Sequence, residues 1–104
     1  MEWLSPWWST ENQDEQFHLE FKMQLEMEVG PEHPLHGIET RLIARGNSDD
    51  ALFKLLDGSG RYAVVHLTWA RHPEPFPWPV TEVFDSLESF VRDRMIPEHA
   101  KLGS

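Results

Sequence analysis

The chain of 104 residues has no cysteine, a single tyrosine and only half as many basic as acidic residues. Without cysteine, neither a disulfide framework nor a thiolate zinc site is available to hold the fold together. No apolar run approaches the roughly 20 residues of a membrane-spanning helix, and no basic and then apolar leader opens the chain. We therefore expect one cytoplasmic domain, residues 1–104, that depends on a hydrophobic core.

The net charge of −9 is concentrated in the N-terminal third. Residues 1–34 contain eight acids and one base, which gives −7, whereas residues 35–71 come to +1 and residues 72–104 to −3. An acidic surface repels phosphate groups, so we expect neither a nucleic acid nor an anionic membrane as partner. The same surface favours a basic protein, although acidity also serves solubility alone.

Residues 17–29 carry a pattern that fits either a strand or a helix. Hydrophobic and polar residues alternate strictly from Phe17 to Val29, which is typical of an amphipathic strand. However, no Val, Ile or Thr lies between positions 11 and 28, and helix-forming Glu, Gln, Lys, Leu and Met dominate. The apolar residues also form two helical stripes, Phe17–Phe21–Leu25–Val29 and Leu19–Met23–Met27. We predict a helix capped by Ser9 or Thr10, with a strand as the alternative.

Three later segments have the composition of strands. They are residues 38–45, 51–56 and 61–69, and residues 80–84 add a short candidate edge strand. Turn-forming residues at 46–50 and 57–60 separate the first three. The segment 61–69 is apolar on both faces, which indicates a central strand covered on both sides.

The C-terminal part carries a helical pattern. Asp85, with Glu88 as its capping-box partner, begins a helix that reaches Met95 and is closed by Pro97. Residues 98–104 are expected to be a loose tail. The predicted fold is thus of the α+β class: an antiparallel sheet of three to four strands packed with an N-terminal helix and a short C-terminal helix.

Aromatic residues gather in two irregular segments. The N-terminal arm, residues 1–9, contains Trp3, Trp7 and Trp8. The proline segment, residues 71–79, has proline at positions 73, 75, 77 and 79, which excludes a helix or a central strand, and it carries Phe76 and Trp78. We expect both segments to lie on the body over a minor core, with a partner-binding aromatic patch as the alternative.

Two strand segments resemble those of a small bacterial protein family. The shared pattern joins the segment His33 to Gly37 to a DDALFKLLDG strand at 49–58 and a YAVVHLTW strand at 62–69. A proline-rich loop and a short helix follow, so the resemblance extends from His33 to the last helix. It implies a helix before residue 30 and a bacterial cytosolic setting, and it implies no activity or catalytic residue.

Histidines are the candidates for chemistry. His33, His36, His66 and His72 could supply a zinc or small-ligand site, although their spacing matches no zinc motif and local hydrogen bonds are the alternative. His66 lies on the apolar strand, so we expect a core histidine whose partner is Thr68, Asp49, Asp50 or a carbonyl group. Its alternative role is that of a general base.

The acidic charge, together with the aromatic residues of the two irregular segments, favours a role in protein binding. The candidate partner-binding residues are Trp3, Trp7, Trp8, Glu20, Glu26, Glu28, Phe76 and Trp78. We expect a small acidic protein-interaction module, of the adaptor or toxin-neutralising type, that binds a basic partner and needs no cofactor. A metal- or ligand-binding domain and an enzyme using His66 are the alternatives, and a homo-oligomer is left open.

Overall fold

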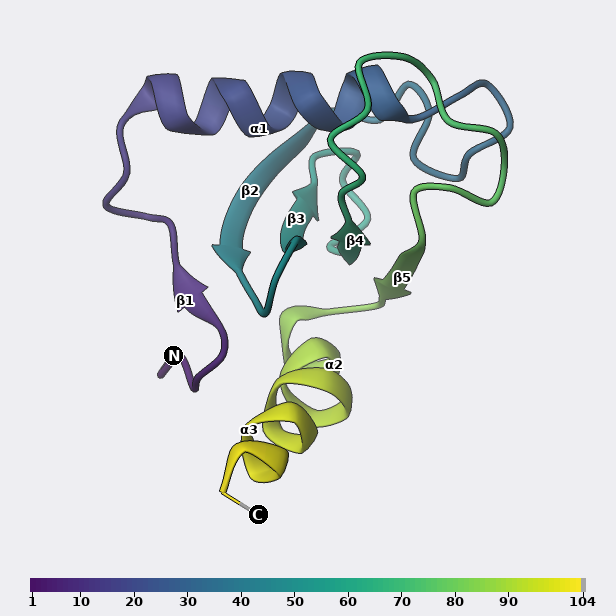
Figure 1. Ribbon diagram of the computed structural model, residues 1–104. Coiled ribbons are helices and arrows are strands. Elements are labelled where there is room, and N and C mark those ends of the chain that lie inside the picture. Colours follow the sequence, from purple (N-terminus) through teal and green to yellow (C-terminus); the bar gives the residue numbers. More distant parts are fainter. Residues whose placement is uncertain (104) are drawn as a thin grey trace.

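A five-stranded antiparallel sheet with a helix on each face forms the protein, as the computed structural model of residues 1–103 shows (Figure 1). Each strand pairs with its neighbours in the sequence, in the order β1-β2-β3-β4-β5. The strands are β1 (Trp8–Ser9), β2 (Thr40–Arg45), β3 (Asp50–Leu55), β4 (Tyr62–His66) and β5 (Thr81–Phe84). The predicted α+β class is confirmed, with one strand more than the sequence predicted because the N-terminal arm pairs with β2.

Residues 17–29, whose pattern fits either a helix or a strand, are helical up to residue 28, as predicted: α1 comprises Glu15–Glu28. Its N-cap is Asp14, whose carboxylate accepts the amide hydrogen of Phe17 at 2.9 Å, so the predicted caps were wrong. Ser9 is part of β1, and Thr10 is buried with its backbone bonded to Ile43. The chain is therefore still extended at these residues and turns into a helix only at Asp14.

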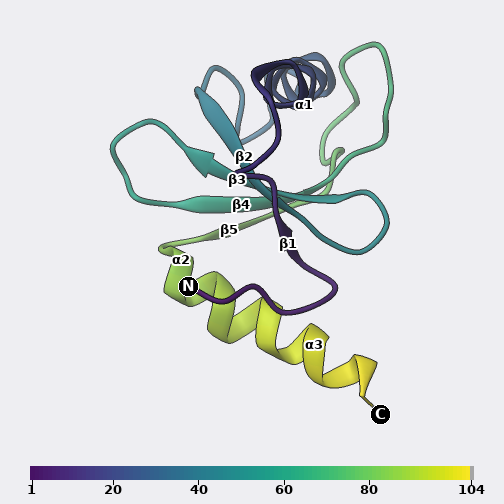
Figure 2. The same cartoon turned by 90° about the vertical axis from the view of Figure 1, so that its left-hand side faces the viewer.

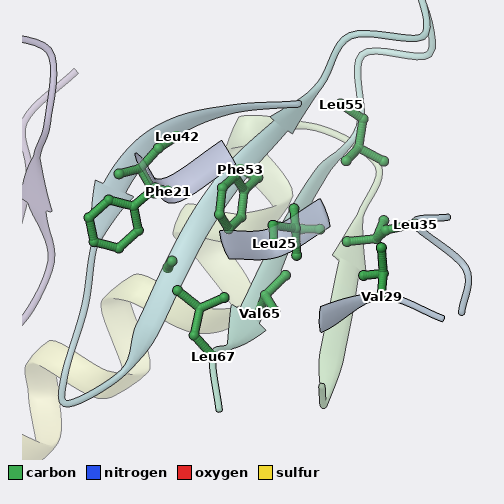
Figure 3. Packing of buried hydrophobic residues seen from close by; sticks show 11 residues of the cluster. Phe21, Leu25, Val29, Leu35, Leu42, Phe53, Leu55, Val65 and Leu67 are labelled. Atoms are coloured by element: carbon green, nitrogen blue, oxygen red, sulfur yellow. The ribbon is translucent and has the colours of Figure 1, made fainter. Parts of the chain in front are cut away.

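The core beneath α1 explains why the helical conformation prevails. Phe21 and Leu25, both buried, face Phe53 and Val65 of the sheet, and the buried Val29 lies beside Leu35 (Figure 3). A strand would place all the alternating apolar side chains on one face, whereas the helix buries one stripe of them. Burial of each such side chain stabilises the fold by roughly 1.5–3 kcal/mol.

A second core lies on the opposite face of the sheet, under the C-terminal helix (Figure 2). Its buried members are Trp7, Ala44, Leu52, Val64, Phe84, Phe90 and Met95. Strand β4 contributes Ala63 and Val65 to the first core and Val64 to the second. The prediction of a central strand covered on both faces is confirmed.

The C-terminal helix is longer than predicted. It runs through α2 (Leu87–Phe90), a π-helical turn η1 (Val91–Met95) and α3 (Ile96–Leu102). Ser86, not Asp85, is the N-cap, because its hydroxyl accepts the amide hydrogen of Ser89 at 3.1 Å. Pro97 lies in the first turn of α3, where a missing N–H is tolerated, so it does not end the helix. Residues 98–102, expected to be loose, are helical.

The proline segment is neither helix nor strand, as predicted, and runs beside the C-terminal end of α1 (Figure 1). The amide of Glu74 donates a hydrogen bond to the carbonyl oxygen of Glu28 at 2.8 Å. This bond connects the proline segment to α1. None of the helices in residues 1–103 is long and apolar enough to cross a membrane.

Candidate functional site

Two of the three acidic residues predicted to bind a partner are on the surface. Glu20 and Glu26 are exposed on α1, whereas Glu28 is fully buried. The prediction of Glu28 as a contact residue was therefore wrong. The physical reason is that the last turn of α1 lies against the chain that leaves β4, and Glu28 faces this chain rather than solvent.

The Glu28 carboxylate anchors the two residues that follow Leu67. Its Oε1 atom accepts the amide hydrogen of Thr68 at 2.8 Å and the Thr68 hydroxyl at 3.0 Å. Its Oε2 atom accepts the amide hydrogen of Trp69 at 3.0 Å and the side-chain amide of Gln24 at 2.7 Å. These four bonds compensate a buried charge, and they hold Trp69 at a φ of 62°, which is rare outside glycine.

The outer face of α1 carries an exposed apolar stripe. Leu19 is 48% and Met23 52% exposed, one helical turn apart, and the helical periodicity places both away from the buried Phe21 and Leu25. Glu20 and Glu26 flank them, and Glu15 lies one turn before Leu19. The stripe that contains Phe21 and Leu25 is therefore packed against the sheet, whereas the stripe that contains Leu19 and Met23 is bordered by acidic residues.

A shallow groove of about 240 Å³ lies between α1 and the start of β2, next to this stripe. Its lining residues are Glu15, His18, Leu19, Lys22, Glu39, Thr40, Arg41 and Leu56. Two ion pairs border it: Lys22 Nζ lies 2.8 Å from Glu39, and Arg41 lies 3.4 Å from Glu15. The hydrogen bond that Lys22 donates to the Glu39 carboxylate raises the pKa of Lys22 above its usual value. The lining charges therefore cancel.

Two buried polar atoms of this lining have no hydrogen-bond partner within residues 1–103. They are Nδ1 of His18 and Oγ1 of Thr40. The other ring nitrogen of His18 donates to the carbonyl oxygen of Thr10 at 2.9 Å, which leaves Nδ1 as an unused acceptor. His18 does not stand out in the sequence, because in the alternating pattern it lies among the polar, solvent-facing positions.

The predicted aromatic residues do not form one patch. Trp7 is buried in the second core, where its ring packs edge-on against Phe90 at 5.0 Å. Trp3 is partly buried beside it, and Trp8 is 44% exposed on β1. Phe76 is 59% and Trp78 46% exposed in the proline segment, which leads into β5 at the edge of the sheet opposite β1 (Figure 1). The N-terminal arm is the packed strap that we expected.

The predicted histidine ligands do not converge. His33 is buried and fully used: Nε2 donates to the carbonyl oxygen of Pro79 at 2.9 Å, and Nδ1 accepts the amide hydrogen of Leu35 at 3.0 Å. His36 and His72 lie exposed on separate loops. In the part of the chain that the structure describes, no three His, Cys, Asp or Glu side chains are arranged to hold a metal ion.

His66 is not the core residue that the sequence analysis expected. Its side chain is 51% exposed, because β4 ends at this residue. Asp50, one of the predicted partners, lies directly opposite in the β3–β4 ladder, and Nδ1 of His66 donates to its Oδ1 at 3.0 Å. Asp49 instead accepts the indole N–H of Trp69 at 2.9 Å, so the two adjacent acids have separate roles.

Comparisons with known proteins give no indication of function, so the proposals below depend on the geometry of the site. No family model, curated protein or solved structure matches the chain.

Proposed function

We propose that the protein is a small acidic interaction domain, of the adaptor or toxin-neutralising type, that acts in the cytoplasm and binds a basic partner on the outer face of α1. The main supporting observation is the exposed pair Leu19 and Met23 on a helix whose other apolar stripe is already buried. Solvent-exposed apolar side chains in a row mark interaction surfaces more often than isolated ones do.

Charge supports a basic partner. Glu20 and Glu26 flank the stripe, whereas Glu15 is paired with Arg41 and the only base on α1, Lys22, is paired with Glu39. An amphipathic partner segment with Lys or Arg beside its apolar residues would match this arrangement. Met23 adds an unbranched, adaptable side chain of the kind that is common on binding surfaces. The protein charge of −9 would steer such a partner from a distance.

The neighbouring groove supports the same surface. It extends the apolar stripe through Leu56, which is 48% exposed.

Affinity capture from host lysate with matched variants tests the proposal. Glu20→Lys/Glu26→Lys reverses charge on the proposed surface, and Leu19→Ser/Met23→Ser removes its apolar part. Asp85→Lys/Glu88→Lys is the control, because both residues are exposed near the C-terminal helix on the other face of the sheet. Each charge-reversal pair changes the net charge from −9 to −5, two reversals of +2 each.

We expect one dominant basic protein, retained by the wild type and by the control but lost from both surface variants. Its association rate at low salt should fall about tenfold with Glu20→Lys/Glu26→Lys and much less with the control, because steering depends on local charge. Equal capture by the wild type and all variants would contradict the proposal. So would a retained partner of acidic character.

A further inference from the structure

A second groove lies on the opposite face of the sheet from α1, at the end of β4. It has a volume of about 560 Å³ and is lined by Asp50, Val64, His66, Val80, Glu82 and Arg94. Val64 is a member of the second core, and Arg94 belongs to η1 of the C-terminal helix. The groove therefore lies beside the C-terminal helix, which is on the opposite face of the sheet from α1 (Figure 2).

His66 presents an unused acceptor to this groove. Its Nδ1 is committed to Asp50 at 3.0 Å, and a carboxylate can only accept, so Nδ1 carries a hydrogen. No group in residues 1–103 bonds to Nε2, and half of the side chain is exposed. In neutral His66, a ligand that donates a hydrogen bond can therefore bind Nε2 without displacing a protein group.

Arg94 does not make the groove an anion site, because three carboxylates surround it. Nη2 lies 3.0 Å from Asp50 and Nη1 3.0 Å from Glu82, while Nε bonds to Glu98. Of the lining residues, Asp50 and Glu82 are negative and Arg94 is positive, which gives the groove a net charge of −1 with His66 neutral. An anion entering the groove would be repelled by this excess, and a cation would be attracted.

The wall of the groove suits an organic cation. Val80 is 48% exposed and offers an apolar surface to an alkyl chain. Glu82 is 57% exposed, and only its Oε1 is bonded to Arg94, so the second carboxylate oxygen is available. Aliphatic ammonium and guanidinium groups combine such an apolar stem with a charged donor.

We propose that this groove binds an alkylammonium or alkylguanidinium group, as on a Lys or Arg side chain, between His66 Nε2 and the Glu82 carboxylate. The stem of the ligand lies on Val80, and the charged head donates to both acceptors. Asp50 fixes the imidazole, and Arg94 holds Asp50 and Glu82 in place. This site is separate from the α1 surface and does not depend on it.

NMR titration of the intact protein tests the site with four defined probes: N-acetyl-lysine methylamide, N-acetyl-arginine methylamide and their neutral counterparts, the Nε-acetylated lysine and the citrulline compound. We expect saturable shifts of the His66, Val80 and Glu82 signals with one or both cations and none with the neutral probes. A stronger response to the lysine or the arginine probe identifies the preferred head group.

Glu82→Gln should weaken the binding about fivefold, the effect of losing roughly 1 kcal/mol from a half-exposed ion pair. Glu88→Gln neutralises a carboxylate on the C-terminal helix outside the groove and should bind as the wild type does. Linear shifts without saturation, or equal shifts with the citrulline probe, would overturn the proposal. Leu19→Ser/Met23→Ser should leave this binding unchanged, which separates the site from the α1 surface.

Discussion

Replacement of Glu28 by glutamine tests the most consequential contact in the structure. The substitution preserves the shape of the side chain but replaces one acceptor oxygen by an NH₂ group. All four groups around the carboxylate are donors: two backbone amides, the Thr68 hydroxyl and the side-chain amide of Gln24. Whichever position the NH₂ group takes, it faces donors.

The magnitude follows from counting the bonds that the amide loses. With NH₂ at the Oε1 position, the Thr68 amide loses its partner, although the hydroxyl can rotate. With NH₂ at the Oε2 position, the Trp69 amide loses its partner, and Gln24 can flip its amide only by giving up its bond to the Ala70 carbonyl, at 2.9 Å. Bonds to a charged group contribute about 1.5–3 kcal/mol each, so the loss should be about 3 kcal/mol.

Equilibrium unfolding in urea, followed by circular dichroism, measures this loss. We expect Glu28→Gln to lower the free energy of unfolding by about 3 kcal/mol, a large part of the 5–15 kcal/mol typical of a domain. Glu26→Gln, on the exposed side of α1, should change it by less than about 0.5 kcal/mol. Hydrogen exchange should accelerate at Thr68 and Trp69. If Glu28→Gln is as stable as Glu26→Gln, the carboxylate is not the anchor described above.

Further predictions concern the second core and the β3–β4 turn. Gly46→Ala should destabilise the protein by about 1–3 kcal/mol in thermal unfolding, since a Cβ there would lie 2.8 Å from the buried Trp7 ring. Phe90→Ala should lower the free energy of unfolding by about 3–5 kcal/mol in urea, because this buried ring contacts Trp7 and Phe84. Hydrogen bonds from Ser59 lower the pKa of Asp57 to about 2 from 3.8. The hydrogen bonds of the ionised Asp57 carboxylate should therefore stabilise the folded protein fully above pH 3.8, and this stabilisation should be lost as the pH falls through 2. An NMR titration of the Asp57 carboxylate with its midpoint near 3.8 would contradict this prediction.

The two aromatic segments differ in what they contribute. The N-terminal arm pairs with β2 and inserts Trp7 into the second core, where the absence of a side chain at Gly46 leaves room for the indole ring. The proline segment leaves Phe76 and Trp78 exposed. Trp8 and Trp69 are also partly exposed, at residues whose backbone is fixed by strand pairing or by Glu28.

Local sequence was sufficient to predict α1 and strands β2 to β5. The helix-forming composition of residues 15–28 outweighed the strand-like alternation, and the segment Asp57 to Gly60 forms the predicted turn, with Gly58 and Gly60 at positive φ. The two-faced apolar pattern of β4 correctly indicated a central strand. A hairpin closed at this turn also brings position 50 opposite position 66, which made Asp50 a correct candidate partner for His66. The helix composition, the turn residues and the strand pattern depend on neighbours within a few residues, whereas the Asp50–His66 pairing follows from the hairpin that the turn closes.

Which polar side chains are buried was decided only by the tertiary structure. Glu28 and Glu26 are alike in the sequence pattern, yet one is sealed against the chain after β4 and the other is exposed. His66 is exposed because its strand ends there, and His18 is buried because the N-terminal arm crosses beside it. Periodicity places a side chain on one face of its own element, but burial depends on which distant segment packs against that face. The sequence by itself therefore determined α1, strands β2 to β5 and the net charge, whereas packing between distant segments determined β1 and the candidate sites.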